Sequence, residues 1–218
     1  MEILKEFENS LFFVLVAFVL AFSLYQSISV GLNTDTPIVT VISESMSQNY
    51  GGRFGRISES FDNGFSIKTF FSPQIGFNRG DIVLVRGVDF DEITAGYDDG
   101  DIIIFESDNE VLRDNMPPMI HRVVERDETF LTTKGDANEE RVEYCVDRYG
   151  RFDLNYDSCS EDEKLVKIEE NITEEQVLGK AFFVVPKVGY AKIIPSCGFH
   201  RVFSPNSDYT QYVCDTLF

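Results

Sequence analysis

An uncharged apolar segment near the N-terminus constrains the fold of this chain more than any other feature. It runs from Leu11 to Leu32 without an Asp, Glu, Lys or Arg. As a helix, a segment of this length crosses the roughly 30 Å hydrocarbon core of a bilayer. The alternative is a cleaved secretory leader, but no basic region precedes the segment, its apolar core is too long and no clear Ala-x-Ala site follows. We therefore expect a retained membrane-spanning helix.

The charges that flank this segment predict its orientation. Lys5 and the amino terminus precede it, and no Lys or Arg follows until Arg53. Positive charge tends to remain on the cytoplasmic side of a membrane. We therefore expect a cytoplasmic stub over 1–10, a transmembrane helix over 11–32 and an extracytoplasmic domain over 33–218.

The net charge excludes one broad class of partner. The chain has 19 Lys and Arg against 37 Asp and Glu, a formal net charge of −18. Binding to nucleic acid through its phosphates needs a basic face, so a nucleic-acid partner is not expected. A hydrophobic content of 43% is too high for a disordered chain, and the acidity suits a domain exposed to salt.

The cysteines favour disulfides over a metal site. Cys145, Cys159, Cys197 and Cys214 include no Cys-x-x-Cys pair, and the chain has only two His, so neither zinc nor another metal is expected. Neighbouring pairs close short loops, which favours Cys145–Cys159 and Cys197–Cys214 in an oxidising compartment. Four free buried thiols are the alternative.

Short apolar runs separated by Gly and Asp predict a mainly β domain after the helix. Two segments, at about 47–79 and about 143–175, interrupt this pattern and are interpreted as insertions. The first is rich in Gly, Ser, Asn and Phe, and the second is strongly acidic. The predicted strands are 37–42, 81–85, 101–105, 120–124 and 181–185.

A short serine-containing segment is the first candidate for chemistry, since no P-loop, dinucleotide fingerprint or Gly-x-Ser-x-Gly elbow is present. Ser43-Glu44-Ser45-Met46 directly follows the first predicted strand. A serine nucleophile needs a base, and a neutral imidazole with a pKa near about 6.5 can accept its proton. The choice is between His121, inside a predicted strand, and His200 near the C-terminus. An ordinary polar turn and structural histidines are the alternative interpretation.

An acidic residue follows the first of these histidines. Thr132-Thr-Lys-Gly-Asp-Ala-Asn138 comes about one strand and one turn after His121, and its Asp136 could reach back towards the imidazole. Turn chemistry explains a Gly-Asp pair equally well.

The order of these pieces is more specific than any one of them. Anchor, Ser-x-Ser-Met, two Gly-Asp strands, Ile-His-Arg-Val-Val and Lys-Gly-Asp-Ala-Asn follow one another over most of the chain. This series resembles type I signal peptidases of the archaeal and endoplasmic-reticulum branch, in which a His replaces the Lys base of the bacterial enzymes. The resemblance implies a signal-peptidase-like (LexA-like) β domain after the single transmembrane helix.

The resemblance also implies roles for individual residues. Ser45 corresponds to the nucleophile and His121 to the general base, while Ser43 contributes a hydroxyl to the oxyanion hole beside the Ser45 backbone N–H. Asp136 matches the Asp of the family's Gly-Asp-Asn-Asn box and is expected at the catalytic site. Glu44 stands where the family commonly has Gly, and we expect it to face solvent because it would oppose a developing oxyanion.

The third member of the expected triad is left open by the sequence. The family has a second acidic residue about six positions after the box Asp, where this chain has Val142. Glu139, Glu140 and Glu143 lie nearby, so each is a candidate beside Asp136, and the alternative role for Asp136 is to support the site.

The implied function is a membrane-anchored serine endopeptidase that removes signal peptides from secretory preproteins, cutting after small residues at the outer membrane surface. Secretory preproteins, membrane lipid and translocon or other signal peptidase subunits are the expected partners, and no cofactor is expected. The location would be the cell membrane, or the endoplasmic-reticulum membrane in a eukaryote. The alternatives are a non-catalytic surface-binding domain and a non-catalytic subunit of a secretion complex.

Overall fold

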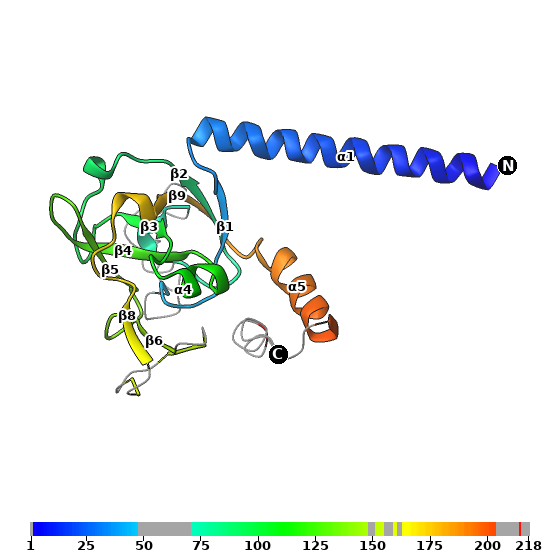
Figure 1. The fold of residues 1–218 in the computed structure, drawn as a ribbon. Coiled ribbons are helices and arrows are strands. Elements are labelled where there is room, and N and C mark those ends of the chain that lie inside the picture. The colour runs from blue at the N-terminus through cyan, green and yellow to red at the C-terminus, as the bar shows by residue number, and fades with distance from the viewer. Residues whose placement is uncertain are drawn as a thin grey trace, which may run out of the picture.

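The computed structural model describes residues 2–47, 71–147, 151–154, 159–160, 163–203 and 214. A long N-terminal helix leads into a β domain, and a shorter helix leaves it near the C-terminus (Figure 1). The elements in chain order are α1 (Glu2–Leu32), β1 (Ile38–Thr40), η1 (Pro73–Ile75), β2 (Ile82–Arg86), η2 (Phe90–Glu92), β3 (Ile102–Phe105), α4 (Glu110–Asn115), β4 (Met119–Arg126), β5 (Leu131–Lys134), β6 (Glu143–Asp147), β7 (Phe152–Leu154), β8 (Glu163–Lys167), η3 (Glu174–Gln176), β9 (Val177–Val185) and α5 (Tyr190–Phe203).

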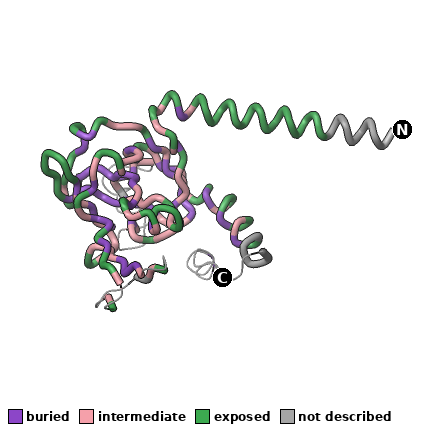
Figure 2. The backbone as a smooth tube through the Cα atoms, viewed as in Figure 1, coloured by how far each residue is buried: buried purple, intermediate pink, exposed green. Residues whose placement is uncertain are grey.

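Helix α1 contains a segment, Leu11–Leu32, that is long and apolar enough to cross a membrane. Its side chains are exposed along most of this segment, and the helix projects away from the β domain (Figure 2). The C-terminal end of the helix is bonded to the chain that follows: the Tyr25 hydroxyl donates to the Asp35 carbonyl at 3.2 Å, and the Gly87 N–H donates to the Leu32 carbonyl at 2.7 Å. Just after the helix, the Thr34 hydroxyl donates to the Leu178 carbonyl at 2.8 Å. The exposed apolar side chains of Leu11–Leu32 suit an environment of lipid.

The domain is built on a six-stranded antiparallel sheet with the order β1-β2-β9-β3-β4-β5. All five predicted strands overlap members of this sheet. Central strand β3 is buried on both faces, because alternate side chains of a strand point to opposite sides. Ile102 and Ile104 enter one apolar cluster, and Ile103 and Phe105 enter the other.

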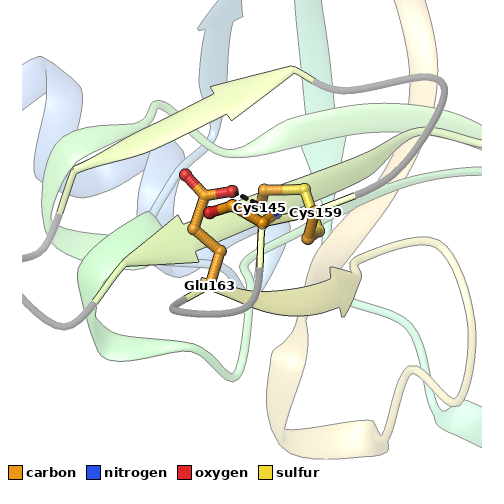
Figure 3. The surroundings of a disulfide bond; sticks show 4 residues. Cys145, Cys159 and Glu163 are labelled. Carbon is orange, nitrogen blue, oxygen red and sulfur yellow. Dashed lines mark hydrogen bonds between the residues drawn. A yellow bond between two sulfur atoms is a disulfide. The ribbon is translucent and has the colours of Figure 1, made fainter.

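The acidic segment expected to be an insertion folds into a second, three-stranded sheet with the order β7-β6-β8. Its apolar side packs with Leu112 of α4 in a separate cluster. A disulfide joins Cys145 in the middle of β6 to Cys159, beside Glu163 at the start of β8 (Figure 3). The segment thus has its own core and covalent closure.

A second disulfide, Cys197–Cys214, holds helix α5. Ile193 and Cys197 are buried with Cys214, and Ile42, two residues after β1, packs against them. Both disulfides are the pairs favoured by spacing. The other predicted insertion, 47–79, lies mostly outside the described residues, and its described part contains η1.

Candidate functional site

Ser45 lies in a tight turn that follows β1. The Ser47 N–H donates to the Glu44 carbonyl at 2.8 Å, which closes the turn. Met46 is 2% exposed in the core beneath it, and its carbonyl accepts from the Phe77 N–H at 3.0 Å. Glu44 is exposed, as expected. A buried methionine and an outward carboxylate therefore leave Ser45 half-buried at the surface of the core.

His121 approaches this serine from β4. It pairs with Ile103 of β3 and is 5% exposed, with its ring 6.3 Å from that of Phe105. Its Nε2 lies 3.0 Å from Ser45 Oγ, within the range for direct proton transfer. The chain's other histidine, His200, belongs to α5, and its side chain lies outside the described part.

The acid behind the imidazole is Glu169. Its Oε1 lies 2.5 Å from His121 Nδ1, and neither atom has a hydrogen-bond partner elsewhere in the described residues. Glu169 is fully buried. Its Oε2 accepts from the Val142 N–H, and its carbonyl accepts from the Thr133 N–H at 2.9 Å. A carboxylate offers only acceptors, so it favours the proton on Nδ1 and leaves Nε2 free to accept from Ser45.

The four acids proposed for this place lie elsewhere. Asp136 accepts from Arg122 Nε at 2.8 Å and Nη2 at 2.7 Å, so the expectation that it faces the imidazole is corrected. Arg122 directly follows His121 on β4, so the two side chains point to opposite faces of the sheet. Because Asp136 pairs with Arg122, it lies on the face away from the imidazole. Glu139 and Glu140 are exposed, and Glu143 lies 3.4 Å from the Lys167 ammonium.

Asp136 still belongs to the structure that supports the site. Arg122 is fully buried and also donates to the Gly100 carbonyl at 2.9 Å. This pair holds the turn after β5, and the Ala137 N–H of that turn donates to the Ser45 carbonyl at 2.8 Å. A Cβ on Gly135 would come within 2.8 Å of the same carbonyl oxygen, so the close approach requires glycine.

Ser43 lies beside Ser45. Its Oγ is 3.1 Å from Ser45 Oγ. A hydroxyl at this distance can donate to an oxyanion that forms beside Ser45. The Ser45 backbone N–H, the other expected donor, belongs to the same turn.

Charged residues near Glu169 in the sequence form a network of ion pairs. Lys167 lies 3.4 Å from Glu143 and 3.5 Å from Glu170, and Arg141 bridges Glu170 and Glu125 at 3.3 and 3.2 Å. The hydrogen bond that Lys167 donates to Glu143, followed by the charge of Glu170, raises the pKa of Lys167. These neighbours therefore pair with one another at the surface, apart from the imidazole.

The three side chains include the groups that one class of chemistry uses. A serine hydroxyl, a histidine acceptor and a buried carboxylate lie in line, as nucleophilic attack on a carbonyl requires. The described residues contain no group of three or more His, Cys, Asp or Glu that could hold a metal ion.

Sequence reasoning missed Glu169 because it lies in the acidic segment interpreted as an exposed insertion. A weak signal was present: Val166 and Ile168 alternate in the sequence directly before it, and both are buried. That pattern indicates a strand leading into the interior, but it does not distinguish Glu169 from the adjacent Glu170.

Comparison with known proteins adds no relative. No protein-family model matches the chain, and no curated protein matches its sequence.

Proposed function

We propose that this protein is a membrane-anchored serine endopeptidase that removes signal peptides from secretory preproteins. The observation that carries the proposal is the line of contacts from Ser45 through His121 to the buried Glu169, at 3.0 and 2.5 Å. The ordered motifs that resemble signal peptidases of the archaeal and endoplasmic-reticulum branch supply the substrate class. A LexA-like arrangement of the β domain is part of this proposal.

The connection between helix and site supports a substrate at the membrane. Strand β1 begins six positions after Leu32, and the Ser45 turn follows β1 directly. The end of α1 is bonded to the same domain through Gly87. A signal peptide has its apolar segment in the bilayer and its small-residue cleavage site just outside, so tethering raises the effective concentration of enzyme and substrate.

The edge of the sheet supports an extended substrate. β1 is an edge strand, and among the described residues its ladder partner is β2. An extended peptide can add to such an edge through main-chain hydrogen bonds, which would carry its scissile carbonyl towards Ser45. Shallow pockets beside the strand would admit Ala-sized side chains.

The mechanism follows from the contacts. His121 Nε2 takes the Ser45 proton as Oγ attacks the carbonyl carbon, and Glu169 stabilises the imidazolium that forms. The Ser43 hydroxyl and the Ser45 N–H donate to the oxyanion. The imidazolium then protonates the leaving amine, and a water molecule activated by His121 hydrolyses the acyl-enzyme.

The proposed location is the cell membrane, or the endoplasmic-reticulum membrane in a eukaryote, with the N-terminus in the cytoplasm and the β domain outside. Translocon components or other signal peptidase subunits are the proposed protein partners. The acidity of the chain gives no basis for a nucleic-acid partner.

Cleavage of a preprotein by the purified full chain in detergent tests the proposal. We expect Ser45→Ala and His121→Ala to abolish cleavage and His200→Ala, as a histidine-matched control, to retain it. Equal cleavage by the wild type and Ser45→Ala would show that Ser45 is not the nucleophile. No cleavage by a folded wild type, together with no labelling by a fluorophosphonate, would favour the non-catalytic alternatives.

A further inference from the structure

The C-terminal part of the described chain has an unusual charge distribution. The protein has 37 Asp and Glu, yet none occurs between Glu175 and Asp208. The same stretch has four cations: Lys180, Lys187, Lys192 and Arg201. Lys180 belongs to β9 and pairs with Asp101 at 2.5 Å, whereas Lys187 and Lys192 are exposed just before and on α5. Exposed cations in a strongly acidic protein favour a surface that meets negative charge.

Helix α5, inside this stretch, has one buried face and one exposed apolar face. Ile193 and Cys197 are 4% and 1% exposed and pack towards Cys214. Ile194 is 53% exposed, and Val188, two residues before the helix begins, is 51% exposed. Ala191, Pro195 and Gly198 are exposed at intervals of three and four residues along the same side, which is the spacing of one helix face.

The position of α5 in the fold relates it to the candidate membrane span. α1 and α5 project from the same side of the β domain (Figure 1). α1 is exposed along most of Leu11–Leu32, whereas the described part of α5 alternates between buried and exposed residues (Figure 2). α1 contains the one candidate span, Leu11–Leu32, among the described residues. A bilayer that holds α1 therefore borders the side from which α5 projects.

We propose that α5 is a second membrane contact, which rests on the lipid headgroups through its exposed apolar face. Val188 and Ile194 would enter the boundary between headgroups and acyl chains, and Lys192, which is exposed between them, would meet lipid phosphate. The inference depends on α1 as the membrane span and not on peptidase activity.

The contact has a consequence for the candidate site. Ile193, on the buried face of α5, packs with Ile42, which directly precedes Ser43. α5 thus connects the bilayer surface to the start of the Ser43–Ser45 turn. Two separate membrane contacts, α1 and α5, would fix the tilt of the β domain relative to the bilayer.

The absence of tryptophan from the chain provides a clean test. Ile194→Trp introduces a single indole, and the full-length protein is reconstituted in phosphatidylcholine–phosphatidylglycerol vesicles with brominated acyl chains. Leu165→Trp is the matched control, since Leu165 is 44% exposed on β8, away from α5. We expect blue-shifted emission at 194, with at least threefold stronger bromine quenching than at 165. Val188→Trp should behave like Ile194→Trp, and adding Lys192→Glu should reduce the quenching.

Equal, red-shifted and weakly quenched emission from positions 194, 188 and 165 would overturn the proposal. So would a blue shift at 194 that rises with protein concentration in detergent and is insensitive to brominated lipid, because a second copy of the chain would then cover the face. Circular dichroism establishes that each variant is folded.

Discussion

Replacing Glu169 with Gln tests the assignment of the acid most directly. Both carboxylate oxygens face a donor: Oε2 accepts from the Val142 N–H and Oε1 lies 2.5 Å from His121 Nδ1. An amide has one acceptor oxygen and one NH₂ donor, so it cannot satisfy both. The backbone N–H cannot change, whereas an imidazole can change tautomer. We therefore expect the amide oxygen to face Val142 and the NH₂ to face Nδ1, which places the imidazole proton on Nε2.

That tautomer cannot accept a proton from Ser45. The same carboxylate-to-amide change lowers kcat by about 10⁴-fold in Ser-His-Asp proteases, which corresponds to about 5 kcal/mol of activation free energy. We expect a loss of this size in single-turnover cleavage of a preprotein, and a parallel loss in labelling by a fluorophosphonate. The second readout needs no knowledge of the substrate.

The control for this change is the adjacent Glu170→Gln. Glu170 contacts Arg141 and Lys167 at the surface, with a side chain 28% exposed, and such pairs contribute about 0–1 kcal/mol. Its kcat should stay within about twofold of the wild type, because no step of the proposed mechanism uses it. If folded Glu169→Gln retained labelling within tenfold of wild type, or if Glu139→Gln or Glu140→Gln caused the larger loss, the assignment would be refuted.

Ser43→Ala should lower kcat by about 10²–10³-fold in the same cleavage assay with folding unchanged; an unaltered kcat would remove Ser43 from the oxyanion hole. Gly135→Ala should slow fluorophosphonate labelling by about 10²-fold, because its Cβ would displace Ser45, and wild-type labelling would contradict that close approach. Serine replacement of both cysteines of Cys145–Cys159 should slow labelling more than the same change at Cys197–Cys214, since the first disulfide closes the sheet next to the acid; equal losses would argue against this role.

The sheet was predictable because its signals are local. Apolar runs after Gly-Asp pairs predicted β2 and β3, and the structure explains why each pair begins a strand. The Asp81 carboxylate accepts from the Asn78 and Lys187 N–H groups at 3.0 and 3.1 Å, and Asp101 accepts from the Thr94 N–H at 2.9 Å. The sequence therefore located the two turns correctly, although it did not indicate that both aspartates are buried.

The contact between Ser45 and His121 was predictable only from motif order. Their positions are 76 apart, and neither strand propensity nor periodicity measures such a distance. The expected position of the acid failed for a specific reason. Where the resemblance places an acid, the chain has Val142, but the Val142 N–H donates to Glu169, which follows the neighbouring strand β8. Position 142 thus provides a backbone N–H that holds the Glu169 carboxylate, and it does not provide an acidic side chain of its own.

Glu169 and Glu170 show why composition could not identify the acid. Both belong to the segment whose charge suggested an exposed acidic insertion, and nothing in their residue type separates them. Ile168 and Ile172, on either side of the pair, are 3% and 0% exposed and bind the segment to two apolar clusters. That packing turns one glutamate into the interior against an imidazole and leaves the next beside Lys167 and Arg141 at the surface. The role of each acid in this segment is therefore decided by where the second sheet buries its backbone, which is a property of the assembled fold.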